Sequence, residues 1–296
     1  MSSKLIITVA PTGGMAPKEA SPHLPTQPDE IADSVIKSAK AGAAIAALHA
    51  RRPDHLATCN PDIYRAINEK VRAGSDIILN NSTGGGSTGD MVLERPDGIC
   101  ENNFDERLKG TMAGAEMCTM DAFTAVDTVV PGKELLVLTT PARCEILAKT
   151  MQEKGIKPEW EVFSPAHIIN DANRLIAMGY DKPPYFFNFV LGANRNFQGA
   201  MPYSHDILEA MIKLLPEGSV WNISAIGPAQ LAGTTQAMLW GGHVRVGLED
   251  NLYYARGEKA TNEQLVARTV RIAKELQLDI ATPGEARDML GLKALK

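Results

Sequence analysis

The stretch AAIAALHARRPDH, residues 43–55, begins as an apolar run and then reaches His49 and Arg51. A short, almost unbroken apolar run predicts a strand that is buried on both faces. Strands of this kind are typical of parallel sheets covered by helices. The two polar side chains that close the run are therefore expected at the carboxyl edge of such a sheet.

Seven other apolar runs, several rich in β-branched residues, follow the same pattern and alternate with helical segments. Several of these segments open on Asp, Asn or Pro and end on Gly. These are helix start and stop signals, because a side-chain oxygen caps free N–H groups and Gly accepts a left-handed turn. Eight strand-helix repeats predict parallel pairing and one α/β fold, the (β/α)₈ TIM barrel of about 250 residues. The predicted strands are residues 4–11, 43–51, 76–83, 115–123, 159–165, 185–192, 219–227 and 243–250.

We predict a single barrel domain over residues 1–296 with a C-terminal helical extension. Two domains would require a polar, Pro/Gly-rich linker near the middle of the chain, and TTPARCEILAK at 139–149 does not supply one. The amphipathic segment 261–277 is expected to pack on the barrel exterior. The tail 281–296 either covers the barrel or supports a neighbouring subunit.

The composition indicates a globular protein, with 44% hydrophobic and 22% charged residues. A net charge of -5 argues against nucleic-acid binding, which favours basic domains. The chain has 4 cysteines, too few for a disulfide framework and without a CxxC pair, which fits a reducing compartment. It contains no run of about 18 apolar residues that would span a membrane. We therefore expect a cytoplasmic protein.

Polar residues close nearly every predicted strand. In a barrel of this kind the active site forms at the carboxyl ends of the strands, where the following loops converge. These positions are therefore the candidate site. They hold Thr12, His49, Arg51, Ser82, Thr83, Thr119, Asp121, Glu161, Asn188, Ser224, Glu249 and Asp250.

The last predicted strand, in GGHVRVGLEDN at 241–251, ends in an Arg and two acids. Glu249 and His49 are candidate ligands for Zn²⁺ or a similar ion, because carboxylate and imidazole both bind such metals. His49 is alternatively a hydrogen-bonded core residue. Arg245 can hold Asp250 ionised and oriented as a base, and the alternative is a structural ion pair at the barrel mouth.

A glycine-rich loop, NNSTGGGSTGD at 80–90, follows the third predicted strand. Its backbone N–H groups and the hydroxyls of Ser82 and Thr83 are candidates for binding a carboxylate or phosphate. The loop lacks the spacing of a nucleotide-binding motif. It is equally consistent with a mobile lid.

Four segments together resemble the beta-keto acid cleavage enzymes: ITVAPTGG with LPTQPDEIADS, AGAAIAALHAR, NNSTGGG, and GGHVRVGLEDNLYY with NEQLVARTVRIAKELQ. The resemblance runs along nearly the whole chain, and GGHVRVGLEDN is its most specific part. It implies a (β/α)₈ barrel, usually tetrameric. It also implies a reaction in which a beta-keto acid and acetyl-CoA give acetoacetate and a new acyl-CoA through a metal-stabilised enolate.

The resemblance also implies roles for individual residues. His49 and Glu249 correspond to zinc ligands, and Arg245 and Asp250 to the dyad that removes a proton from the keto acid. The implied contacts to the substrate are Ser82 and Gly85, which bind its carboxylate, and Thr119.

Two positions depart from the family pattern. The first histidine of the family's HxH zinc motif is Ala47 here, which leaves two protein ligands where catalytic zinc usually has three. A water, a substrate oxygen or a carboxylate such as Glu161 would have to replace it. Met15 stands where family members that cleave an amino substrate have a glutamate, which argues against a cationic amino substrate.

Three functions remain open from the sequence. The first is cleavage of a beta-keto acid with acetyl-CoA. The second is a metal-dependent lyase or hydrolase that uses the same barrel without CoA. The third is a non-catalytic relative that binds a small acid, because a shared fold does not determine function.

Overall fold

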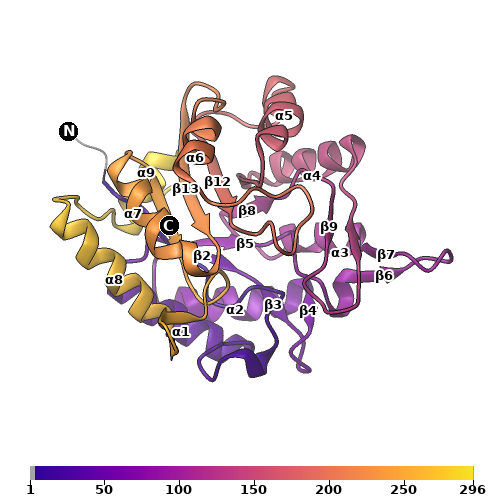
Figure 1. Cartoon of the computed structure of the whole chain (residues 1–296), viewed down its shortest axis with the longest axis horizontal. Coiled ribbons are helices and arrows are strands. Elements are labelled where there is room, and N and C mark those ends of the chain that lie inside the picture. Colours follow the sequence, from indigo (N-terminus) through magenta and orange to yellow (C-terminus); the bar gives the residue numbers. More distant parts are fainter. Residues whose placement is uncertain (1–3, 296) are drawn as a thin grey trace.

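The computed structural model describes residues 4–295, and eight parallel strands in it close into a barrel in the order β1-β14-β13-β12-β11-β8-β5-β2 (Figure 1). Every predicted strand is present, so the predicted TIM barrel is confirmed. Each run forms a buried strand because helices cover its outer face while the barrel interior covers its inner face. The barrel strands are β1 (Ile7–Val9), β2 (Ile45–Leu48), β5 (Ile78–Asn81), β8 (Met117–Met120), β11 (Lys157–Val162), β12 (Tyr185–Leu191), β13 (Ser219–Ala225) and β14 (His243–Val246).

Helices on the outside connect successive barrel strands, and their ends carry the predicted caps. Asn60 accepts a hydrogen bond from the Asp62 N–H at the start of α2, and Thr261 and Gln264 form a capping box at the start of α8. The α-helices are α1 (Pro28–Ala41), α2 (Pro61–Gly74), α3 (Phe104–Lys109), α4 (Pro141–Lys154), α5 (Asn173–Ala177), α6 (His205–Ile212), α7 (Gln230–Leu239), α8 (Asn262–Glu275) and α9 (Pro283–Leu290). Shorter helical turns are η1 (Lys18–Ala20), η2 (Gly89–Met91), η3 (Gly110–Met112), η4 (His167–Ala172) and η5 (Gly227–Ala229).

The C-terminal extension covers the amino-terminal end of the barrel. Ala286 and Leu290 of α9 belong to the same buried cluster as Ile6, Ile45 and Phe186, which lie near the starts of their strands. Of the two roles expected for the tail, the structure supports covering the barrel. A contact between subunits stays a prediction.

Short extra strands follow the carboxyl ends of barrel strands. They make a four-stranded sheet, β6-β7-β10-β9, and two small antiparallel pairs. Figure 1 shows the β6-β7 hairpin projecting from the body of the molecule. Apart from β3, which lies within the predicted strand 43–51, these strands were not predicted, because runs of two or three residues carry no periodic signal. They are β3 (Ala50–Arg51), β4 (Ala57–Thr58), β6 (Val92–Glu94), β7 (Cys100–Asn102), β9 (Ala125–Asp127), β10 (Leu135–Val137), β15 (Tyr253–Ala255) and β16 (Glu258–Lys259).

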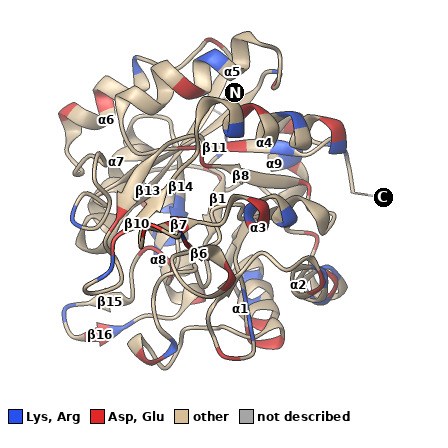
Figure 2. Ribbon diagram, turned by 90° about the vertical axis from the view of Figure 1, so that its right-hand side faces the viewer, with Lys and Arg blue, Asp and Glu red and all other residues tan. Residues whose placement is uncertain are grey.

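Acidic and basic residues alternate along the ribbon in Figure 2, and both kinds occur in most of the helices. Within residues 4–295, no helix combines the length and the apolar character needed to cross a bilayer.

A polar layer lies inside the barrel beneath the mouth. Thr8, Asn80, Glu159 and Asn222 are fully buried and come from the alternate strands β1, β5, β11 and β13. Alternate strands build one layer of a TIM barrel, and such a layer is usually made of bulky apolar residues. The Asn80 amide donates a 2.5 Å hydrogen bond to Glu159, and burial raises the pKa of Glu159 to about 7.

Glu159 should therefore make stability depend on pH. An acid whose pKa is raised in the folded state stabilises fully below its unfolded pKa near 4.5, and this stabilisation is lost as the pH rises toward 7. We expect the free energy of unfolding of Glu159→Gln, relative to that of the wild type, to be about 3 kcal/mol higher at pH 8 than at pH 4.5. Urea unfolding at both pH values measures this difference. The exposed control Glu69→Gln should show no such change, and an equal response of both variants would contradict the prediction.

Candidate functional site

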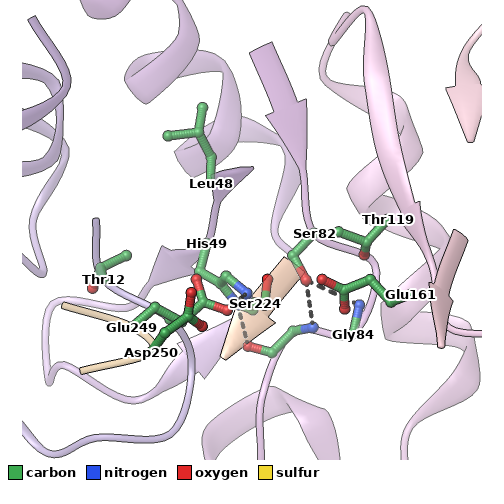
Figure 3. A network of polar contacts seen from close by, with 12 residues as sticks. Thr12, Leu48, His49, Ser82, Gly84, Thr119, Glu161, Ser224, Glu249 and Asp250 are labelled. Atoms are coloured by element: carbon green, nitrogen blue, oxygen red, sulfur yellow. Dashed lines mark hydrogen bonds and ion pairs between the residues drawn. The ribbon is translucent and has the colours of Figure 1, made fainter. Parts of the chain in front are cut away.

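A cavity of about 1160 Å³ opens at the carboxyl ends of the barrel strands. Eight of the predicted site residues line it: Thr12, His49, Ser82, Asp121, Glu161, Arg245, Glu249 and Asp250. Figure 3 shows His49 grouped with Glu249 and Asp250, with Ser82 beside them. The barrel thus brings together residues that are about 200 positions apart in the chain.

His49 directly follows β2, and alternation along the strand turns it into the cavity while Leu48 points away (Figure 3). Its Nδ1 lies 3.0 Å from the Gly85 carbonyl oxygen, which can only accept, so Nδ1 carries the proton. Its Nε2 lies 3.3 Å from Oε1 of Glu249. The hydrogen bond at Nδ1 therefore fixes the orientation of the ring and turns Nε2 toward the carboxylate of Glu249.

Arg245 is the centre of a buried ionic network. Its Nε and Nη2 donate to the two oxygens of Asp250 at 3.0 and 2.8 Å, which is a bidentate pair. Nη2 also donates to Glu249 at 2.6 Å, and Nη1 donates to Glu161 at 2.9 Å. One guanidinium therefore positions three carboxyl groups.

The acids in this network differ in their ionisation. Burial disfavours the charge on Glu249, but Arg245 and His49 outweigh burial and lower the pKa of Glu249 to about 2. Burial raises the pKa of Asp250, against the opposing effect of Arg245. Burial, then repulsion by Asp121, raises the pKa of Glu161 well above its usual value. Glu249 is thus a permanent anion, whereas the raised pKa suits Asp250 to exchange a proton.

The glycine loop folds against the residues that follow β1. The Ser82 hydroxyl accepts hydrogen bonds from the N–H groups of Gly84 and Gly85 at 3.1 and 3.2 Å. A Cβ on Gly14 would lie 1.8 Å from the Gly85 carbonyl oxygen, so glycine at position 14 permits the two loops to touch. The loop amides are occupied by Ser82, and its hydroxyl remains at the cavity surface.

Thr83 and Thr119, two other predicted contacts, lie behind the cavity lining. The Thr83 N–H donates to the Thr119 hydroxyl at 2.9 Å, and the Thr83 hydroxyl donates to the Thr119 carbonyl at 2.7 Å. Both side chains are almost fully buried. They join the ends of β5 and β8, and a role in substrate binding stays a prediction.

Arg107 of α3 is a cavity residue that the sequence analysis missed. It is buried and donates to the Thr83 carbonyl, the Thr139 hydroxyl and the Asp121 carbonyl at 2.9, 2.5 and 3.1 Å. It therefore ties the glycine loop to the end of β8. No motif signals it, because α3 spans only 6 residues.

The family described as beta-keto acid cleavage enzyme matches residues 4–292. The chain belongs to this family. The match confirms the resemblance found in the sequence and the prediction of an enzyme.

Two curated relatives match over almost their full length. The 3-keto-5-aminohexanoate cleavage enzyme of Fusobacterium nucleatum subsp. nucleatum is 38% identical, over 99% of this chain and 100% of that protein. The 3-dehydrocarnitine:acetyl-CoA trimethylamine transferase of Rhizobium meliloti is 33% identical, over 99% of this chain and 98% of that protein.

The solved binary complex of ObcA with oxaloacetate resembles the chain with a TM-score of 0.70. It is 21% identical and covers 93% of this chain and 68% of that one. At this level of identity the likeness supports the barrel fold alone.

The zinc site that the family resemblance implies is incomplete in this chain. His49 and Glu249 converge, and Oε2 of Glu249 is buried without a hydrogen-bond partner among residues 4–295. Position 47, two residues before His49 on the same face of β2, is a buried alanine with no ligand atom. Within the described residues, no group of three His, Cys, Asp or Glu side chains is arranged to hold a metal. The residues present therefore do not fit a zinc ion with three protein ligands.

Proposed function

We propose that this protein transfers an acyl group from a beta-keto acid to CoA, with acetyl-CoA as the second substrate and acetoacetate as the second product. The observation that carries the proposal is the Arg245–Asp250 pair, which is buried at the cavity and lies beside Glu249 and His49. Family membership and the acetyl-CoA in the name of the Rhizobium meliloti relative support it.

Asp250 is the proposed base. Arg245 binds both of its oxygens and leaves each oxygen further lone pairs, so the carboxylate stays oriented while it accepts a proton. It would remove a proton from C2 of the keto acid, between the ketone and the carboxylate. The negative charge of the resulting enolate would develop beside His49.

The bonds then exchange in two steps. C2 attacks the acetyl carbon of acetyl-CoA, a new carbon–carbon bond forms, and the CoA thiolate leaves. The thiolate next attacks the original ketone carbon, the bond from that carbon to C2 breaks, and the new acyl-CoA forms. The acetoacetate enolate takes its proton back from Asp250, so atoms and charge balance and the base is restored.

The Ser82 hydroxyl is the proposed donor to the keto-acid carboxylate. Its oxygen already accepts from two loop amides, so its proton is free to point into the cavity. Gly85 would contribute by holding His49 through its carbonyl. Thr83 and Thr119 would support the loop from behind.

The test is whether acetoacetate forms, and on what it depends. Purified protein is incubated with a 3-oxo acid, with and without acetyl-CoA, and both products are measured. We expect acetoacetate and the new acyl-CoA in equal amounts only when acetyl-CoA is present. Loss of the keto acid without CoA would instead establish the lyase or hydrolase. Binding without turnover would establish a non-catalytic protein.

Three further features remain proposals. They are a zinc ion completed by water or substrate oxygens, a homotetramer, and a cytoplasmic location. No step of the mechanism above depends on any of them. The single domain is likewise kept over residues 1–296 as predicted, and its first three residues and its last one lie outside the described part of the chain.

A further inference from the structure

One half of the barrel mouth is apolar. At the carboxyl ends of four consecutive strands, β8, β11, β12 and β13, a polar residue is followed two positions later by an apolar one. Side chains two apart on an extended strand point the same way, which places Val190 of β12 one step nearer the opening than Asn188. The other three apolar residues directly follow the ends of β8, β11 and β13. The pairs are Asp121 and Phe123, Glu161 and Phe163, Asn188 and Val190, and Ser224 and Ile226. All four apolar members line the cavity.

These residues, with Phe197, form what we call the apolar wall: Phe123, Phe163, Val190, Phe197 and Ile226. They belong to an apolar cluster that is separate from the two main cores of the barrel. The ring centroid of Phe163 lies 4.5 Å from that of Phe123 and 5.5 Å from that of Phe197. The wall is therefore a packed aromatic surface, and its outer face borders the cavity.

Charged side chains near the wall are either engaged with the protein or exposed: Glu161 accepts hydrogen bonds from Arg245 and Asn188, Asp121 lies 3.6 Å from Arg107, and Arg195 is exposed on the loop that carries Phe197. His167 stacks on Phe123 at 4.7 Å, and burial lowers the pKa of His167 to about 4, so the ring is neutral near pH 7. Asp127 also lines the cavity, but its oxygens bind the Ser87 hydroxyl and the Val129 N–H. A charged group placed against the aromatic rings would lose hydration, and the nearby carboxyl groups of Asp121 and Glu161 already face Arg107 and Arg245.

The groups assigned to the proposed reaction lie on the other half of the mouth. His49, Ser82 and Asp250 follow β2, β5 and β14, which with β1 form the complementary four strands of the barrel. In the proposed function, the carboxylate and ketone of the substrate bind among these groups. The substituent on the ketone carbon would then extend across the cavity toward the apolar wall.

We propose that the apolar wall binds an uncharged alkyl or aryl substituent of the beta-keto acid, so the substrates are 3-oxo acids with an apolar group on the ketone. This inference rests on the proposed function. We infer that the wall binds the beta-keto acid and not the pantetheine arm of CoA, because the wall is continuous with the residues that surround the reacting ketone. Met15 adds a further apolar side chain to the lining.

The test compares acids of equal shape and different charge. 5-Methyl-3-oxohexanoate and 3-keto-5-aminohexanoate differ by a methyl group in place of an ammonium group. We expect kcat/KM to favour the methyl compound by about 100-fold or more. Each methylene added from 3-oxopentanoate to 3-oxohexanoate and beyond should raise kcat/KM by about fourfold until the wall is covered. Equal kcat/KM values for the two compounds, or a higher value for 3-keto-5-aminohexanoate, would overturn the inference.

Ile226→Asp tests the wall itself, and Ile146→Asp on the exposed side of α4 is the matched control. We expect Ile226→Asp to reduce the methyl-to-ammonium ratio by about tenfold or more, with the KM for acetyl-CoA unchanged, and the control to change neither value. A raised KM for acetyl-CoA with an unchanged ratio would assign the wall to pantetheine and overturn the inference. The wild-type series remains decisive if this variant fails to fold. If no 3-oxo acid yields acetoacetate, the proposed function fails, which is a different result from turnover with the opposite preference.

Discussion

Replacing Asp250 with asparagine is expected to lower kcat/KM by about 10²- to 10⁴-fold. Asparagine has nearly the same shape and can still accept one hydrogen bond from Arg245, so the network around the guanidinium keeps most of its contacts. What disappears is the ability to accept the proton from C2 of the keto acid. The measurement is the initial rate of acetoacetate formation with saturating acetyl-CoA.

A structural role for Asp250 predicts a different pattern. The buried Arg245 would lose part of its charge compensation, so the melting temperature must be measured alongside the rate. Asp288→Asn, on the exposed face of α9 at the opposite end of the barrel, is the matched control and should retain full activity. Near-normal turnover by a folded Asp250→Asn variant would mean that the base has been assigned to the wrong residue. Exchange of the C2 hydrogen in deuterium oxide without acetyl-CoA isolates the proton transfer, and this exchange should fall with the rate.

The second large effect is expected in metal binding. Ala47→His should increase zinc affinity by about 100-fold or more. Positions 47 and 49 point to the same side of β2, so the new imidazole would join His49 and Glu249 as a third protein ligand. Changes to groups that merely orient a ligand already alter affinity by about 10- to 100-fold, and a direct ligand should contribute at least as much. Competition with a chelator of known affinity, followed by elemental analysis, measures the change.

Two variants control for the size of the new side chain. Ala47→Phe introduces a ring without a nitrogen and should bind no more zinc than wild type. Combining Ala47→His with His49→Ala removes one ligand again and should return the affinity toward the wild-type value. Tight, stoichiometric zinc in the wild-type protein would contradict the two-ligand description and show that another group completes the site.

The strands and the position of the site were both predictable from local signals in the sequence. The run before His49 is apolar over a few consecutive residues, and burial on both faces is enough to make such a run a strand. The acids after β14 were found because a TIM barrel places its chemistry at the carboxyl ends of strands. Both predictions used information contained within about ten residues and one general rule of the fold.

Other features depend on contacts between distant segments. Arg107 lies in a short helix, and it became part of the site because its side chain reaches the ends of β5 and β8. The loop amides after Ser82 were expected to bind substrate, and the structure places two of them on the Ser82 hydroxyl. Sequence spacing cannot tell which of several possible partners a backbone N–H will meet.

The apolar runs and helix signals of the sequence are enough to predict the barrel and the end of it that holds the site, and the family resemblance indicates the missing zinc ligand at Ala47. Three features follow only from contacts in the folded chain: Arg245 binds three carboxyl groups at once, Glu159 is enclosed in a polar layer, and one half of the mouth carries an apolar wall. The physical reason is that burial and periodicity act within one segment. Hydrogen bonding, desolvation and charge depend on which side chains of different strands meet when the barrel closes.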